Sequence, residues 1–162
     1  MATWQQFEQQ APPLAAMVRE RFEAHKHLTM ATLRANGSPR ICGTEVPITG
    51  GELYLGGMTG NRRFADLRRD PRVAIHSGSD APEQWNGDAK VAGRAVELTE
   101  DADREVLRAA VRSGGGEVPD GEFELFRVDL TEASVVRLSE AKDHLLVDTW
   151  RDGVGTTTVE RR

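Results

Sequence analysis

The chain has 162 residues, of which 38% are hydrophobic and 29% charged, and its formal net charge is −5. These proportions are typical of a soluble globular protein, and the length predicts a single domain over residues 1–162. The acidic balance argues against a nucleic-acid-binding protein, and no apolar run is long enough to cross a membrane.

The N-terminal segment, residues 1–26, is predicted to be helical. Four apolar residues recur there at helical spacing, namely Leu14, Met17, Val18 and Phe22. The beginning of the chain lacks the basic and apolar regions of a signal peptide, which predicts a cytoplasmic location. Cys42 is the only cysteine, so the sequence excludes a disulfide framework and a thiolate metal cluster.

Three strands are predicted next, over residues 28–34, 39–48 and 52–57. Asn36-Gly37 and Gly50-Gly51 lie between them, and such pairs favour tight turns because the turn positions need positive φ. The three segments therefore predict an antiparallel meander, in which each strand pairs with the next along the chain.

A short helix is predicted over residues 61–69. It ends before Pro71, because the residue ahead of a proline is biased out of the helical conformation. Its narrow apolar side consists of Phe64, Ala65 and Leu67. A second amphipathic helix is indicated by four apolar residues further along: Val106, Leu107, Ala110 and Val111. The segment 113–122 that follows is predicted to be a loop.

The remaining segments have strand patterns, over residues 72–77, 89–99, 123–130, 133–139 and 144–150. Gly93, in the centre of the second of these, indicates a bend or a close backbone approach. Six or seven antiparallel strands with short helices between them predict a mainly β protein and a small closed barrel, because closure removes exposed strand edges. The barrel is predicted over residues 27–151, with a tail over 152–162.

The sequence GGMTGNRRFADLRR, residues 56–69, holds the strongest signal of function. A helix N-terminus offers unpaired N–H groups and a partial positive charge, and Arg62 and Arg63 add permanently charged donors suited to a phosphate. The stretch is neither a Walker loop nor the dinucleotide fingerprint, because both glycine spacings are absent. Two interpretations stay open on the residues alone: an anion site, or a helix face whose arginines are only solvated.

The other candidate residues give weaker signals. Arg68 and Arg69 are expected to be solvated or paired with Asp66 and Asp70. No histidine has the spacing of a metal ligand, and no acid, base or nucleophile stands out, so the catalytic residues stay unassigned. Trp150, at the end of a strand, is expected in a core or an interface, or stacked on the ring of a ligand.

Residues 31–77, followed by 87–98, resemble the pyridoxamine 5′-phosphate oxidase-like, flavin-binding split barrels. The most specific element is a strand, a glycine turn, basic residues, a short helix with DLRRDPRVA, and a further strand. The resemblance implies a six-stranded antiparallel split β-barrel that forms a homodimer and binds FMN in a groove at the dimer interface. It also implies hydride transfer to or from a small molecule.

Matching positions supply the site residues that the resemblance implies. Those that would hold the flavin phosphate are Arg40, Asn61, Arg62 and Arg63. Those that would lie along the flavin, or approach it from the side, are Gly56, Gly57, Met58, Asp88 and Lys90. Trp150 near the end of the chain is the candidate for stacking on the ring.

Alternatives on the same fold stay open. Related proteins use a deazaflavin coenzyme, whose anionic tail would need extra basic surface such as Arg68, Arg69 or Arg72. A flavin- or haem-binding protein without turnover is a further alternative. The Arg-x-His substrate motif of true pyridoxamine phosphate oxidases is absent, with KDH at 142–144 as the nearest match, which argues against pyridoxal phosphate synthesis.

Overall fold

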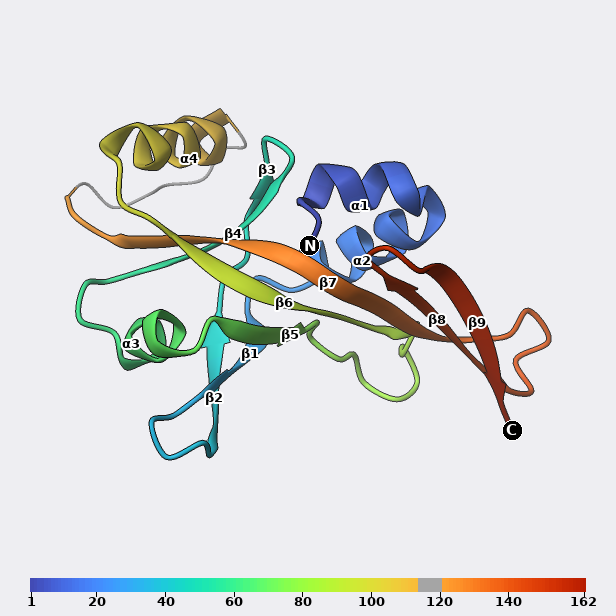
Figure 1. Ribbon diagram of the computed structural model, residues 1–162. Coiled ribbons are helices and arrows are strands. Elements are labelled where there is room, and N and C mark those ends of the chain that lie inside the picture. Colours follow the sequence, from blue (N-terminus) through green and yellow to red (C-terminus); the bar gives the residue numbers. More distant parts are fainter. Residues whose placement is uncertain (114–120) are drawn as a thin grey trace.

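The computed structural model describes residues 1–113 and 121–162, which form nine antiparallel strands and four helices (Figure 1). The strands are β1 (Leu28–Leu33), β2 (Pro39–Thr44), β3 (Ile48–Thr49), β4 (Glu52–Gly57), β5 (Arg72–His76), β6 (Asp88–Leu98), β7 (Glu124–Leu138), β8 (Leu145–Arg151) and β9 (Gly155–Arg161). The helices are α1 (Trp4–Gln10), α2 (Pro12–Glu23), α3 (Arg62–Arg69) and α4 (Asp101–Ser113). The predicted mainly β class is confirmed, although the described strands outnumber the six that were expected.

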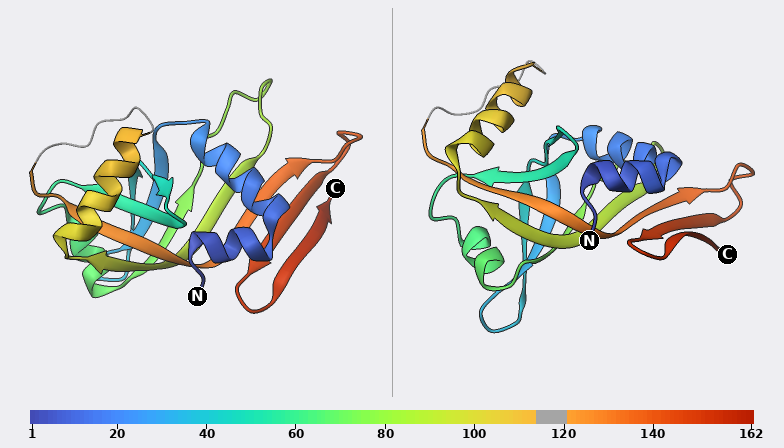
Figure 2. Two further views of the ribbon diagram at one scale, coloured as in Figure 1. Left: turned by 90° about the horizontal axis from the view of Figure 1, so that it is seen from above. Right: turned by 45° about the horizontal axis from the view of Figure 1, so that its top comes forward.

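The strand order β2-β1-β5-β6-β7-β4-β3 begins and ends on strands that are neighbours in the chain. β2 leads into β3 through residues 45–47 alone, so the order returns on itself and the sheet bends into a barrel (Figure 2). β2 pairs with β1, and β3 pairs with β4, but no ladder joins β2 to β4 within the described residues. The predicted three-strand meander is therefore wrong at this step, where the barrel is split.

β7 joins the two parts of the sheet. One of its edges pairs with β6, and the other pairs with β4 through Glu124–Arg127 and with β8 through Glu132–Leu138. Between these two ladders, Ala2 exchanges backbone hydrogen bonds of 2.9 and 2.7 Å with Leu130. The N-terminus thus fills the gap that would otherwise leave the backbone of β7 unpaired there.

The last third of the chain differs from the prediction in two respects. The strands predicted at 123–130 and 133–139 are one continuous strand, β7. β9 was not predicted, and it occupies most of the segment 152–162 that was expected to be a tail. The predicted loop at 113–122 falls mainly on residues outside the described part of the chain.

Glycines fix the turns and one close approach. Gly50 and Gly51 both have positive φ, 59° and 80°, as predicted, whereas in the first hairpin Gly37 alone does, at 81°. At Gly93 the β6–β7 register shifts, and a Cβ added there would lie 2.2 Å from the carbonyl oxygen of Asp129. The predicted close backbone approach at Gly93 is confirmed, because no larger residue fits that space.

The hydrophobic core fills the barrel and continues under α1 and α2, which lie together over one side of the sheet (Figures 1 and 2). Trp4 and Phe7 of α1 are fully buried, and the Phe7 ring lies 4.7 Å from that of Trp150 on β8. On the opposite side, Phe64 of α3 stacks on Phe126 of β7 at 5.1 Å. These aromatic contacts fix both helical regions on the barrel.

The apolar sides of the two later helices differ in detail from the predicted ones. In α3, Phe64 and Leu67 are buried as expected, but Ala65 is exposed and Asp66 is buried instead. In α4, Leu107 is buried whereas Val106 is 55% exposed. α4 covers the outer side of β4, where Leu107 packs in a separate cluster with Tyr54.

Candidate functional site

The turn from β4 into α3 carries the residues of the candidate anion site. Gly60 has a φ of 77°, and Asn61 caps the helix by accepting the backbone N–H of Arg63 on its side-chain oxygen at 3.3 Å. Arg62 is exposed and has no ion-pair or hydrogen-bond partner among the described residues. The backbone N–H groups of Phe64 and Ala65 donate to the carbonyl oxygen of Asn61, and that of Asn61 donates to Glu124 at 3.3 Å. Within the described residues, the start of α3 therefore presents one unpaired N–H, that of Arg62, beside the uncommitted guanidinium of the same residue.

Arg63 has a structural role in addition to its position. Its guanidinium donates to the carbonyl oxygens of Gly43 on β2 at 2.8 Å and of Gly56 on β4 at 3.0 Å. Since β2 and β4 do not pair, Arg63 connects the two strands across the split. A Cβ on Gly57 would lie 2.7 Å from the same guanidinium, so this glycine makes room for Arg63.

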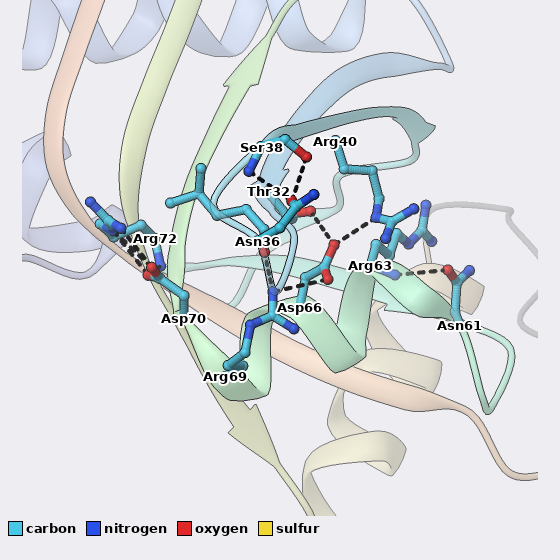
Figure 3. Close-up of polar contacts among 11 residues, drawn as sticks. Thr32, Asn36, Ser38, Arg40, Asn61, Arg63, Asp66, Arg69, Asp70 and Arg72 are labelled. Carbon is cyan, nitrogen blue, oxygen red and sulfur yellow. Dashed lines mark hydrogen bonds and ion pairs between the residues drawn. The ribbon is translucent and has the colours of Figure 1, made fainter.

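Arg40 belongs to a charged cluster around the buried Asp66 (Figure 3). Asp66 accepts hydrogen bonds from Arg40 at 2.6 Å, from Thr32 at 3.0 Å and from Arg69 at 3.1 Å. Burial raises the pKa of Asp66, but these hydrogen bonds outweigh it and hold that pKa below its ordinary value. Arg40 donates to Asp66 through Nε, so its two terminal nitrogens are not used in this hydrogen bond.

The remaining arginines of the basic segment are engaged. Arg68 lies 2.9 Å from Glu97 and 2.6 Å from Glu124. Arg72 pairs with Asp70 at 2.6 Å, and its hydrogen bonds lower the pKa of that aspartate to about 2. The expected pairing of Arg69 with Asp66 is confirmed, whereas the partners of Arg68 come from β6 and β7. Of the arginines within residues 62–72, Arg62 is therefore the one whose side chain has neither an ion pair nor a hydrogen bond among the described residues.

A cavity of about 440 Å³ lies beside this turn. The predicted residues Gly56, Gly57 and Met58 line it together with Arg63. Its other lining residues, which the sequence did not indicate, include Thr44, Leu107, Val111 and Phe123. An amphipathic helix was predicted at α4, but its sequence does not indicate which part of the protein its apolar side packs against. The volume lies within the range of small-molecule sites.

Three of the predicted site residues lie elsewhere. Gly56 lies opposite Leu125 of β7, whereas Asp88 lies opposite Val136, and the stretch of β7 between these positions is roughly 35 Å long at the rise of an extended strand. Lys90 is close to Asp88 on the same strand. Trp150 has no exposed surface and donates its indole N–H to Gln10 at 3.3 Å. Its burial confirms the expectation of a core residue and contradicts the alternative of stacking on a ligand, because the core already surrounds its ring.

Within residues 1–113 and 121–162, no group of three or more histidine, cysteine, aspartate or glutamate side chains is arranged to hold a metal ion. None of the described helices is both long and apolar enough to span a membrane.

Residues 14–137 match the family described as Pyridoxamine 5'-phosphate oxidase. PhzG from Burkholderia lata, solved in complex with tetrahydrophenazine-1-carboxylic acid, has a similar structure, with a TM-score of 0.64, 17% identity and 96% of each chain covered. ChuZ from Campylobacter jejuni has a TM-score of 0.71 and 15% identity over 91% of this chain and 63% of its own. A pyridoxamine 5'-phosphate oxidase-related, FMN binding protein from Nostoc punctiforme has a TM-score of 0.61 and 14% identity, covering 91% and 94%. No curated protein has a significant match to this sequence.

Proposed function

The chain belongs to the pyridoxamine 5'-phosphate oxidase family, and from this premise we propose that it is an oxidoreductase that binds FMN. The observation that carries the proposal is the uncommitted Arg62 at the N-terminus of α3, next in the chain to Arg63, which lines a cavity together with Gly56 and Gly57. A cation with a free helix-terminal amide, close to a hollow that is partly apolar, suits a ligand with a phosphate at one end and a ring at the other.

The phosphate would be held by the guanidinium and the backbone N–H of Arg62 and by the terminal nitrogens of Arg40. Arg62 has the planar donors that phosphate oxygens accept, and no competing carboxylate lies on it in the described residues. Arg63 contributes by fixing β2 and β4 around the site, since its own terminal nitrogens already bind backbone carbonyls. Of the predicted phosphate ligands, Arg63 and Asn61 are the two whose roles we revise, since the side chain of Asn61 caps α3.

The ring would lie along Gly56, Gly57 and Met58, which line the cavity and of which the two glycines have no side chain. A bound FMN supplies the hydride chemistry, and the chain supplies binding, orientation and exclusion of water. No acid or base of the described residues is placed so distinctively in the cavity that we assign it a catalytic role. Activity by this protein would therefore depend on positioning.

We further propose that two copies form the complete site. Ile41 on β2 and Met58 after β4 are apolar and 73% and 81% exposed, and a second subunit would cover such surface. Asp88 and Lys90 lie too far along the sheet to join the site of their own chain. They stay candidates as residues that one subunit contributes to the site of the other.

A deazaflavin coenzyme is the alternative cofactor. Its longer anionic tail would need basic surface beyond Arg62, and the three arginines considered for it, Arg68, Arg69 and Arg72, are all paired with carboxylates. This pairing supports FMN over the deazaflavin. A flavin- or haem-binding protein without turnover is the other alternative, and it differs in what happens after binding.

The absorbance spectrum of the freshly purified protein tests the proposal. We expect the two visible bands of a flavin, or their shift when FMN is titrated into protein that was purified without it. A single band between those positions would indicate the deazaflavin, and a Soret band would indicate haem. Protein that binds neither flavin would overturn the proposal. Reduction of the bound cofactor followed by reoxidation with small acceptors then separates an enzyme from a carrier.

A further inference from the structure

The cavity beside α3 has two different walls. On one side Gly56 and Gly57 present backbone, and this is the side where we place the flavin. On the other side α4 presents Leu107 and Val111, which belong with Phe123 to an apolar cluster separate from the barrel core. Leu107 is buried in this cluster, whereas Val111 is partly exposed and can contact a second molecule that enters beside the flavin.

Charged side chains around the cavity do not favour an anion. Arg63 lines it, but both terminal nitrogens of that arginine bind backbone carbonyls. The carboxylates of Glu45 and Glu122 also line the cavity. Glu45 lies 3.6 Å from Lys26 and 3.7 Å from His27, whereas Glu122 has no ion-pair partner among the described residues.

An anionic group in this cavity would therefore lose water and meet the unpaired carboxylate of Glu122. The guanidinium of Arg63 keeps its charge, but it already directs both terminal nitrogens to carbonyl oxygens, so it offsets that repulsion only in part. Such a group is costly to bury unless it is paired. An uncharged ring has no such cost, and it gains apolar contact with the α4 wall. The cost of burying a charge and the gain from apolar contact together determine which molecules bind in the cavity.

We propose that the cavity selects a neutral, largely apolar substrate, and that Val111 on α4 is a specificity-determining residue for it. The inference rests on the proposed function for the place of the flavin. It goes further by assigning the substrate class and the wall that contacts it, and it excludes phosphorylated substrates.

A matched pair of probe molecules tests the proposed substrate class by binding alone, without redox chemistry. 2-Naphthol and naphthalene-2-sulfonate share the same ring and differ in charge, and equilibrium dialysis with saturating FMN measures the affinity of each. We expect 2-naphthol to bind about tenfold or more tightly than the sulfonate, a difference of about 1.4 kcal/mol or more. Equal affinity for the two probes, or tighter binding of the sulfonate, would overturn the proposal.

Two valines of α4 test whether the apolar side of this helix contacts the bound molecule. Val111→Asp should weaken 2-naphthol binding about tenfold or more, whereas Val106→Asp, on the exposed side of α4, should leave it unchanged. Equal effects of the two variants would contradict the assignment of Val111. If Val111→Asp lowers the melting temperature, Glu122→Gln decides instead: it should tighten sulfonate binding severalfold, and an unchanged sulfonate affinity would count against the proposal.

The same proteins separate this inference from the proposed function. Val111→Asp should leave FMN affinity unchanged, and Arg62→Ala should weaken FMN without changing 2-naphthol binding to FMN-free protein. Loss of the flavin titration with retention of Val111-dependent 2-naphthol binding would reject the cofactor and keep the cavity assignment. The reverse pattern would keep the cofactor and reject the substrate class.

Discussion

At its start, next to Phe123, β7 adjoins the cavity; near Ala133, the same strand lies among tightly packed aromatic rings. Large side chains are treated in opposite ways in these two regions. Met58 at the cavity is 81% exposed, whereas Trp150 is fully buried against Phe7. The comparison teaches that the tryptophan contributes to the packing of the core, and that the proposed function uses the smaller and more exposed residues around the cavity.

Trp150→Ala should have the largest effect on stability. Removing this ring leaves a cavity beside Phe7 and Trp4, and we expect the free energy of unfolding to fall by about 3–5 kcal/mol. Guanidinium unfolding followed by circular dichroism measures the loss. Trp85→Ala, in a partly exposed loop, is the control and should cost much less. If Trp150→Ala unfolded at the same midpoint as the wild type, the conclusion that Trp150 stabilises the fold would be wrong.

Asp66→Asn should come next, with a loss of about 3 kcal/mol, because Arg40 and Arg69 would lose a buried charged acceptor. Because the folded pKa of Asp66 lies below the ordinary 3.8, its contribution is complete above that value and is lost as the pH falls through the folded pKa. We therefore expect the free energy of unfolding, measured from pH 7 to pH 2, to differ in its pH dependence. Below about pH 4 it should fall less steeply in the variant than in the wild type.

Asp101→Asn is the control for that pH series, since the Asp101 side chain is fully exposed. Its profile should follow that of the wild type. If the Asp66→Asn profile also follows the wild type below pH 4, the hydrogen bonds to Asp66 do not stabilise the folded state in the way the geometry indicates.

Arg63→Ala should destabilise the protein by about 2 kcal/mol, because it leaves the carbonyl groups of Gly43 and Gly56 without their donor. Arg63→Lys should recover only part of the loss, since one ammonium does not reproduce the fork that reaches both strands. Thermal unfolding measures both variants. Full stability of Arg63→Ala would show that the link across the split is dispensable, and would return Arg63 to the set of phosphate ligands.

Arg62→Ala should leave the unfolding midpoint unchanged and raise the Kd for FMN about tenfold to a hundredfold. The reason is the loss of a charge-assisted contact from a side chain that makes none within the described protein. Fluorescence titration at low salt measures the affinity. Arg72→Ala, which breaks only an exposed pair with Asp70, should bind FMN as the wild type does. An unchanged Kd for Arg62→Ala would mean that this arginine is only solvated.

Locally encoded features could be predicted from the sequence. The two hairpins, α3 and the close approach at Gly93 each follow from a few consecutive residues, such as Gly50-Gly51. β9 could not be found in this way, because all of its residues are exposed and it has no alternation of apolar and polar side chains. The strand exists because its backbone pairs with β8.

The site was predicted in part, for a related reason. A helix start with two arginines is visible in the sequence, but which arginine is free depends on distant partners. Arg63 is occupied by carbonyl groups of β2 and β4, and Trp150 is buried by Phe7 from the other end of the chain. Contacts between segments so far apart have no local signature, so sequence reasoning treated Arg62 and Arg63 alike.

The position of β7 between β6 and β4 has a consequence for how the chain is made. β4 and β6 leave the ribosome well before Glu124, and their facing edges have no partner until β7 follows. Pairing across so long a stretch of chain is non-local, which slows folding. Until β7 is inserted, open edges can associate with other chains. A chain that stopped before Glu124 would stay in this aggregation-prone state, with half of a barrel and nothing to close it.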